Sequence, residues 1–206
     1  MTPSHMQKVL LFLPKGYEEL EATAFIDIMG WSRAHGTAPV TLHTTGLHDE
    51  VSSAWGSRVI PSLPFSKADA DSYDAFAIPG GFEAAGYYED AFDERVLELI
   101  RQFNEQRKPV ASVCVGALPV ARAGVLKNRQ ATTYALPRGE RRKQLADYGA
   151  IVIDQPLVRD QNIITSEGPA TALDVAFSLL ELLTGKDNVR RVKEYMRIVG
   201  CSAPSG

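Results

Sequence analysis

A cysteine stands where a strand is expected to meet a helix, in the stretch VASVCVGALPVA that begins at Val110. Val110 to Val113 is predicted to be a short apolar strand, and a helix is predicted to begin at Gly116. Cys114 therefore occupies the turn between them. Because ligands bind beyond the carboxyl ends of the strands in an open parallel sheet, we expect the Cys114 thiol to face a binding site.

The start of the helix gives Cys114 a chemical setting. Free N–H groups and the helix dipole stabilise an anion there, so the sequence predicts a lowered pKa for the thiol. The N–H group of Val115 is placed to donate to an anion beside the sulfur, and Gly116 relieves crowding in the turn. The alternative is a small buried cysteine that only fills space. Cys201, in the tail GCSAPSG, lacks such a setting and is expected to have no role.

Glu21 lies in the loop and helix that follow the first predicted strand. It falls within the arc of an apolar stripe formed by Leu20, Ala24, Ile28 and Trp31. Burial would raise the pKa of this carboxyl group, so it is expected to stay protonated and to donate a hydrogen bond to a thiolate. A carboxylate at the rim of the helix start is the alternative. Glu18 and Glu19 are expected to point into solvent.

A third loop follows the predicted strand Ala75–Ile78 and contains Pro79, Gly80 and Gly81. Two glycines let the backbone approach a ligand closely and present N–H groups to it. Most such sequences are only turns. After a central strand, this one becomes a candidate oxyanion hole.

The three loops connect predicted strands and helices, because short apolar runs alternate with helical patterns along the sequence. Continuous apolar runs are typical of strands buried on both faces, and strand–helix repetition predicts a parallel sheet with helices on both sides. Val51–Pro64 interrupts the rhythm and is predicted to form a β-hairpin, and the basic run Pro137–Gln144 is expected to be a solvated helix face. The predicted strands are Val9–Leu13, Val40–Thr44, Ala75–Ile78, Val110–Val113, Ile151–Ile153 and Ile163–Thr165. The predicted helices are Glu19–His35, Asp93–Gln106, Gly116–Gly124, Gly139–Tyr148, Ala170–Leu183 and Lys186–Met196.

Length and composition limit the number of domains, the classes of partner and the cellular setting that the sequence allows. The 206 residues are expected to form one domain, 1–206, with a core of about 7–185, a last helix at 186–198 and a short tail. A net charge of -3 gives no basic excess, so neither nucleic acid nor an anionic membrane is expected as a partner. The apolar runs are too short to cross a bilayer, and no signal peptide is identified. Two cysteines favour a reducing, cytoplasmic setting. No cofactor and no metal site are predicted.

Four segments in order resemble the ThiJ/PfpI superfamily of DJ-one-like proteins. They are KGYEELEA at Lys15–Ala22, IPGGF at Ile78–Phe82, SVCVGALPVARAGVLKNRQATTY at Ser112–Tyr134 and ITSEGPATALDVAFSLLELL at Ile164–Leu183. The resemblance implies an α/β, flavodoxin-like three-layer sandwich related to class I glutamine amidotransferases. Its members usually form homodimers.

The resemblance also implies roles for individual residues. Cys114 would be the nucleophile and Glu21 its acid partner. Backbone N–H groups at Gly81 and Val115, with Gly80 beside them, would stabilise a developing anion. Within the matching segments, the residues expected to line the pocket are Tyr134, Phe82, Gly168 and Pro169.

Two positions depart from the pattern of enzymatic relatives. Many of these carry a histidine directly after the cysteine or in a later TTH-like motif, where this chain has Val115 and Tyr134. A Cys–His–Glu amidotransferase triad and a Cys–His peptidase mechanism are therefore not expected. Isonitrile hydratases of the superfamily carry an acid where Glu21 stands, but a threonine where Val115 stands, so this chain matches them only in part.

Two classes of function remain open. The first is an enzyme in which Cys114 attacks a small electrophile, such as a 2-oxoaldehyde or a nitrile-like carbon, while Glu21 moves protons. The second is a redox or electrophile sensor in which Cys114 is oxidised to a sulfinate. A relative without activity is a third reading. Because Ile26 and Met29 lie opposite the apolar stripe of their helix, a homodimer is expected, unless the predicted hairpin covers that side.

Overall fold

A seven-stranded sheet forms the centre of the computed structural model, which describes residues 6–136 and 138–198. Its strands run in the order β10-β11-β7-β6-β1-β2-β5, and all neighbours are parallel except β10 and β11. The predicted α/β, flavodoxin-like sandwich with a mostly parallel sheet is therefore confirmed. The strands are β1 (Gln7–Phe12), β2 (Val40–Gly46), β5 (Leu63–Pro64), β6 (Ala75–Ile78), β7 (Val110–Ser112), β10 (Leu157–Asp160) and β11 (Ile163–Ser166).

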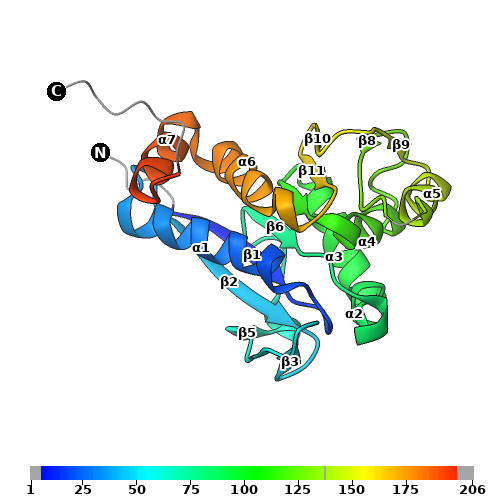
Figure 1. Ribbon diagram of the computed structural model, residues 1–206. Coiled ribbons are helices and arrows are strands. Elements are labelled where there is room, and N and C mark those ends of the chain that lie inside the picture. Colours follow the sequence, from blue (N-terminus) through cyan, green and yellow to red (C-terminus); the bar gives the residue numbers. More distant parts are fainter. Residues whose placement is uncertain (1–5, 137, 199–206) are drawn as a thin grey trace.

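Helices cover both faces of this sheet (Figure 1). On one face α1 (Glu19–His35) packs against α6 (Ala172–Thr184) and α7 (Lys186–Tyr195). On the other, α3 (Glu94–Glu105) packs between α2 (Tyr87–Ala91) and α4 (Ala117–Arg122), and α5 (Glu140–Asp147) lies against α4. The central strands are apolar and buried on both sides, as every residue of β6 is, which is why their sequences run without polar alternation. Single 3-10 turns lie at Phe65–Lys67, Glu83–Ala85, Cys114–Gly116 and Pro169–Thr171.

Two expectations about strands need correction. The hairpin is shorter than Val51–Pro64: only β3 (Val51–Ser52) and β4 (Arg58–Val59) pair antiparallel, while β5 joins the central sheet parallel to β2. The strand at Ile151, β9 (Ile151–Val152), does not join the central sheet but pairs with β8 (Gln130–Ala131). Strands of two residues carry too little periodicity to reveal their partners.

Helix α1 is rotated relative to the predicted stripe. Leu20 is 53% exposed, whereas Met29, predicted to lie opposite the stripe, is fully buried. Ala24 and Ile28 are buried as expected. Because α1 contacts the sheet on one side and both α6 and α7 on another, its buried arc is wide and is centred nearer Phe25 than Leu20.

Strand β1 lies at the point where the order of the sheet reverses. β2 pairs on one side of β1 and β6 on the other, so a crevice opens at their carboxyl ends. Glu21 follows β1, Gly80 follows β6 and Cys114 follows β7. Three loops far apart in the sequence therefore meet at one edge of the sheet.

Candidate active site

Cys114 has a backbone conformation that side chains rarely adopt. Its φ is 56°, in the left-handed region, at the tight turn between β7 and α4. Such a residue persists only when its surroundings fix it. Here Thr133 Oγ1 donates to the carbonyl of Cys114 at 2.8 Å, and the Gly116 N–H donates to Val113 O at 2.8 Å. This is the geometry of a nucleophile elbow, which presents the side chain at the end of the sheet.

Gly80 brings Glu21 and Cys114 together. A Cβ at this position would lie 2.8 Å from both Cys114 Cβ and Glu21 Oε2, so only glycine leaves room for the pair. The Gly80 N–H donates to Glu21 Oε2 at 2.5 Å. It is thus occupied by the acid and is not free for a substrate oxygen in this structure. Gly81 and Val115, the other expected donors, both border the cleft.

The Glu21 carboxyl group is fully buried. Burial raises its pKa to about 8, although the Gly80 N–H and the Cys114 thiol lower it, and the charge of Glu18 adds to the rise. The carboxyl group is therefore mostly protonated at pH 7, as the sequence predicts. Because Oε2 accepts the Gly80 N–H, the proton is favoured on Oε1, which is buried and has no hydrogen-bond partner among the described residues. The neutral carboxyl group therefore lies beside the Cys114 side chain.

The expected lowering of the Cys114 pKa is wrong. Burial raises the pKa of the thiol, and the charge of Glu21, when ionised, raises it further. The Val115 N–H lowers it but does not compensate. The residue is only 9% exposed, and α4 has six residues, so desolvation of a thiolate outweighs the short helix dipole. The resting cysteine is a neutral thiol.

Glu18 and Glu19 do not point into solvent as expected. Glu18 is buried and caps α1, because its Oε2 accepts the Glu21 N–H at 2.9 Å, and its Oε1 accepts Trp55 Nε1 at 3.2 Å. Glu19 Oε1 accepts the hydroxyl groups of Ser53 at 2.5 Å and Ser57 at 3.1 Å. The β3–β4 hairpin folds back over the start of α1, a long-range contact that the local pattern around these glutamates does not reveal.

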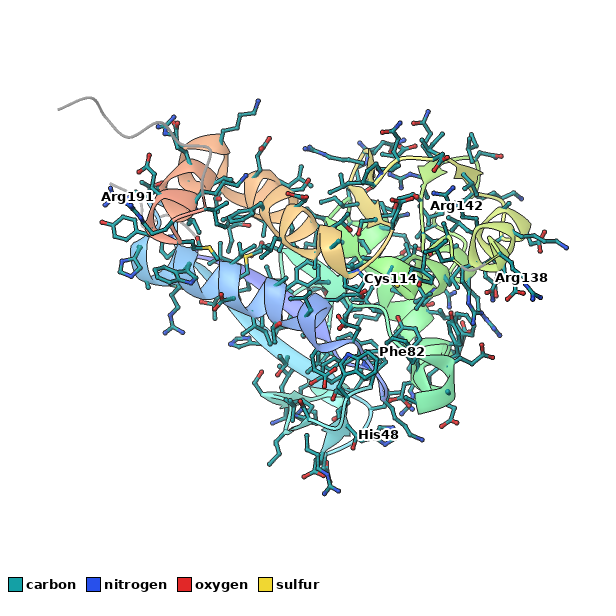
Figure 2. All side chains as sticks on the ribbon, viewed as in Figure 1. His48, Phe82, Cys114, Arg138, Arg142 and Arg191 are labelled. Carbon is teal, nitrogen blue, oxygen red and sulfur yellow. The ribbon has the colours of Figure 1, made fainter. Side chains whose placement is uncertain are left out.

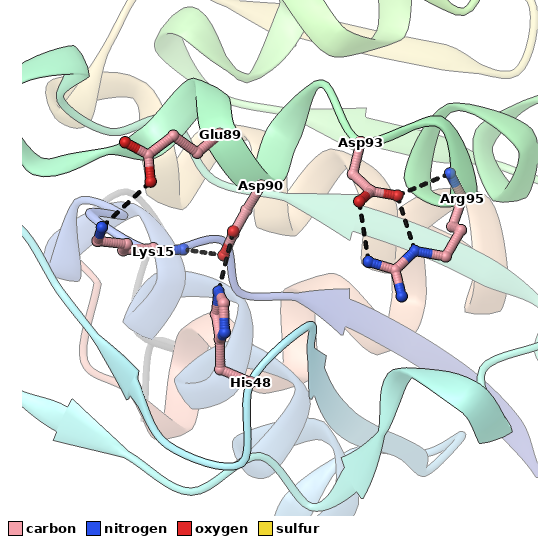
Figure 3. Close-up of polar contacts among 6 residues, drawn as sticks. All are labelled: Lys15, His48, Glu89, Asp90, Asp93 and Arg95. Carbon is pink, nitrogen blue, oxygen red and sulfur yellow. Dashed lines mark hydrogen bonds and ion pairs between the residues drawn. The ribbon is translucent and has the colours of Figure 1, made fainter.

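A polar cluster fixes the loop that carries these acids (Figure 3). Asp90, at the end of α2, accepts the backbone N–H of Lys15 at 2.8 Å and lies 3.0 Å from His48 Nε2. Lys15 Nζ also pairs with Glu89 at 3.2 Å. The β1–α1 loop, the β2–β3 loop and α2 are joined in this way, which restrains Glu21 from outside the site.

A cleft of about 280 Å³ opens above the sulfur. In Figure 2, Phe82 lies near Cys114, while Arg138 and Arg142 lie on the side of α5. Of the expected pocket residues, Tyr134, Phe82 and Pro169 line the cleft, whereas Gly168 lies behind the ring of Tyr134. The full lining is Glu18, Glu21, Gly81, Phe82, Glu83, Tyr88, Cys114, Val115, Tyr134, Leu136, Glu140, Arg141 and Pro169.

Sequence reasoning missed Tyr88 and Arg141 in this lining. Arg141 was expected on a solvated face, but its guanidinium lies 5.1 Å from the ring centre of Tyr88 and pairs with Glu83 at 2.6 Å. Arg142 in the same run pairs with Asp154 and Glu167. Pro137, where the run begins, lies outside the described residues. Only the contact of Arg141 in α5 with Tyr88 in α2 reveals that this part of the run lines the cleft.

The described histidines lie away from the cleft. His35 stacks on Tyr195 with ring centres 4.5 Å apart, His43 Nδ1 lies 2.9 Å from Tyr73 Oη, and His48 contacts Asp90. His5 and Cys201 lie outside the described residues. Within residues 6–136 and 138–198, no group of three or more histidine, cysteine or acidic side chains is arranged to hold a metal ion. The same part of the chain contains no helix long and apolar enough to span a membrane.

The model of the DJ-1/PfpI family matches residues 7–182. The chain belongs to this family. Membership confirms the resemblance drawn from the four sequence segments. A solved structure, Drosophila melanogaster DJ-1beta, shares the fold with a TM-score of 0.82 at 24% identity, covering 95% of this chain and 100% of that one.

The curated relatives that this chain matches differ in length, so the chain spans a different share of each one. The glutathione-independent glyoxalase DJ-1 of Schizosaccharomyces pombe is 30% identical over 195 residues, covering 91% of this chain and 96% of that protein. The isonitrile hydratase of Pseudomonas putida is 32% identical over 143 residues, which cover 69% of this chain and 59% of that protein. DJ-1 homolog B of Arabidopsis thaliana is 28% identical over 181 residues, covering 87% of this chain, which spans only 39% of that protein.

Proposed function

We propose that this DJ-1/PfpI protein is a cysteine-dependent enzyme acting on a small electrophile, either a carbonyl carbon such as that of a 2-oxoaldehyde or a nitrile-like carbon. The observation that carries this is the buried Glu21 carboxyl group, which lies beside the Cys114 thiol and has a pKa of about 8, so that it can both accept and return a proton near neutral pH. The cleft above them, about 280 Å³, suits a small molecule.

The first chemical step needs one proton shuttle. In the fraction of molecules where Glu21 is ionised, its carboxylate accepts the proton of the Cys114 thiol as sulfur adds to the carbonyl carbon. The S–H bond breaks, an S–C bond forms, and the electron pair of the C=O π bond moves to oxygen. Glu21 then returns the proton to that oxygen, giving a neutral thiohemiacetal and an unchanged carboxylate. Backbone N–H groups of Gly81 and Val115 are the donors to the developing oxyanion.

Two relatives support this class of chemistry by name, a glutathione-independent glyoxalase and an isonitrile hydratase. No described histidine lines the cleft, and Tyr134 stands in the slot where histidine-bearing relatives place a base. A tyrosine cannot accept a proton near pH 7 as imidazole does. Proton transfer therefore rests on Glu21, and neither peptidase nor glutamine amidotransferase activity is expected.

Turnover of a panel of 2-oxoaldehydes and isonitriles tests the proposal. Wild type should turn over at least one member, with a rate that rises with pH as Glu21 loses its proton near pH 8. Cys114→Ser and Glu21→Gln should each remove activity, whereas Tyr134→Phe should be milder. If wild type cleaves peptides efficiently and Cys114→Ser abolishes that cleavage, the proposal that no histidine takes part in the reaction is contradicted.

A redox or electrophile sensor is the second candidate. Val115 N–H and the Glu21 carboxyl group both contact the sulfur, and a sulfinate would need such donors. Mild peroxide should then convert Cys114 selectively to sulfinate, while Glu21→Leu should give a product that proceeds to sulfonate or a disulfide. Intact-mass analysis checks this, and equal oxidation of Cys114 and Cys201 that is indifferent to Glu21 would count against it. We favour the enzyme because a buried neutral thiol reacts slowly with peroxide.

Helix α1 supports a homodimer. Leu20 and Ile26 of this helix are 53% and 41% exposed. Large exposed apolar side chains favour burial against a second copy. Light scattering at micromolar concentration should give twice the monomer mass, and a monomer would end this part of the proposal.

A further inference from the structure

Resting on the proposed function, we propose that the cleft selects neutral electrophiles with an apolar or aromatic substituent and excludes carboxylates and phosphates. The residues responsible lie on loops and on α5 rather than in the elbow that carries Cys114. Two independent features of the lining support it, its charge and its outer walls.

Carboxyl groups outnumber cations around the cleft. Four line it, from Glu18, Glu21, Glu83 and Glu140, while Arg141 is the only cation among the described lining residues. Because Glu21 is mostly protonated at pH 7, the repulsion of an anion rests on the other three. The Arg141 guanidinium already pairs with Glu83 at 2.6 Å, and its Nη1 donates to Gln144 at 3.2 Å. It therefore offers little unopposed positive charge to a substrate. An anion in this partly desolvated space would meet net repulsion.

The outer walls are apolar and exposed. Phe82, Tyr134 and Leu136 form them, and Leu136 is 65% exposed. Large apolar side chains that gather around a cavity mouth are typical of a ligand site rather than of an ordinary surface. A substituent that contacts these side chains would lie in the same cleft as the sulfur.

Trp55 extends the wall formed by Phe82. Its ring is 67% exposed yet is fixed on two sides, edge-on to Phe82 with ring centres 4.9 Å apart and by its Nε1 donating to Glu18 at 3.2 Å. An exposed indole held by an aromatic ring and a carboxylate is pre-organised to contact an aromatic substituent. The hairpin tip thus acts as a specificity element for the cleft.

Alkylation of Cys114 measures this selectivity without requiring turnover. In a Cys201→Ser background, which leaves Cys114 as the sole cysteine, the rates of iodoacetamide and iodoacetate are compared by intact mass. Each rate is divided by the rate of the same reagent with glutathione, which removes intrinsic reactivity. The normalised preference for the neutral reagent should be roughly tenfold. A ratio near one, or a thiol that reacts with neither reagent over hours, would overturn the proposal.

Freeing Arg141 should remove the charge preference. Glu83→Gln removes the partner of the guanidinium, so the normalised iodoacetate rate should rise by roughly tenfold. Glu83→Gln combined with Arg141→Gln should lose that gain, because the carboxylate receptor is then absent. A rate that does not change in Glu83→Gln would show that the pair does not control charge selectivity.

The aromatic wall is tested with N-benzyliodoacetamide against iodoacetamide. Wild type should prefer the benzyl reagent, and Trp55→Ala should reduce that preference by roughly fivefold. Trp55 reaches the cleft through its ring contact with Phe82, which lines it. Ile60→Ala is the matched control, since Ile60 is 77% exposed in the same region of the chain but borders a different cavity, and it should leave the preference unchanged. Equal effects of both variants would overturn the role of Trp55. If the enzyme turns over a substrate but shows no such selectivity, only this inference is contradicted. If it shows the selectivity but turns over no substrate, only the proposed function is contradicted.

Discussion

The floor and the mouth of the cleft are built on opposite principles. At the floor, Glu21 and Cys114 are buried against the backbone of Gly80, and their spacing is fixed by three loops at the end of the sheet. At the mouth, Trp55 and Leu136 lie on a hairpin and a loop, and both are mostly exposed. Burial at the floor changes the protonation of acid and thiol together. The exposed side chains at the mouth do not change the protonation of Glu21 or Cys114. They affect only which molecules can approach the thiol.

This contrast separates reactivity from selectivity. A change at the floor should alter stability, pKa and reaction rate at once, because the groups there are desolvated and in contact. A change at the mouth should alter the preference among reagents with little cost in stability, because surface side chains away from special features contribute little to folding. The following predictions test that separation.

The largest expected effect is the pH dependence contributed by Glu21. Its folded-state pKa, about 8, lies above the ordinary value of 4.5, so its contribution to stability is fully present below pH 4.5 and is lost as pH rises through 8. We expect the free energy of unfolding to fall by roughly 3 to 5 kcal/mol over this interval. Urea denaturation at a series of pH values should show a much flatter profile for Glu21→Gln.

Glu19→Gln is the control for this profile, since Glu19 shifts the other way. Burial opposes the shift, but hydrogen bonds from Ser53 and Ser57 lower the Glu19 pKa. Its contribution is present above the ordinary pKa and is lost as pH falls through the folded value, so this variant should differ from wild type at neutral rather than at acid pH. A wild-type profile that rises between pH 5 and 8 would contradict the buried, protonated state of Glu21.

Gly80→Ala should give the next largest effect. The added Cβ would lie 2.8 Å from Cys114 Cβ and 3.0 Å from the Val115 backbone N, so the floor must shift. We expect a loss of about 1 to 3 kcal/mol in the free energy of unfolding, with slower alkylation of Cys114.

Gly30→Ala provides the contrast within a helix. A Cβ at Gly30 meets no atom within 4 Å, so alanine should stabilise α1 by about 0.5 to 1 kcal/mol. Chemical denaturation of both variants checks the pair. Equal stability of the two glycine variants would show that the floor is not tightly packed.

Two adjacent tyrosines should respond in opposite directions to loss of their hydroxyl groups. Tyr87 Oη donates to the buried Pro79 carbonyl at 2.8 Å, so Tyr87→Phe should destabilise the protein by about 1 to 2 kcal/mol. Tyr88 Oη is buried in the described structure without a hydrogen-bond partner, so Tyr88→Phe should be neutral or stabilising by up to about 1 kcal/mol. Thermal and urea denaturation distinguish them. A clear loss in Tyr88→Phe would mean that its hydroxyl group has a partner in solution.

The smallest effect on stability is expected for Trp55→Phe at the mouth. The change keeps an aromatic ring beside Phe82 but removes the indole donor to Glu18, and it should cost less than about 1 kcal/mol. The preference for the benzyl reagent should be largely retained, in contrast to Trp55→Ala. A loss of several kcal/mol would show that the hairpin tip belongs structurally to the floor.

Local patterns in the sequence were sufficient for the mostly parallel sheet and for the candidate site residues at its edge, although not for the short strands β5 and β9. Apolar runs followed by helical spacing predict the parallel sheet, and the ends of its strands place Glu21, Gly80 and Cys114 at one edge. A glutamate inside an apolar arc also predicts its own burial and protonation, because helical periodicity sets which side faces the core.

Only the tertiary structure decided the electrostatics of the thiol and the selectivity of the cleft. A helix start next to Cys114 suggests a lowered pKa, but the extent of desolvation depends on neighbours from other loops and raises it instead. The selectivity likewise depends on distant pairs. Trp55 contacts Glu18, which lies 37 positions away, and Arg141 contacts Glu83, which lies 58 positions away. No local periodicity in the sequence encodes contacts over such separations. Sequence periodicity fixes which way a side chain faces on its own element, whereas its solvent, charge partners and packing are set when distant elements meet.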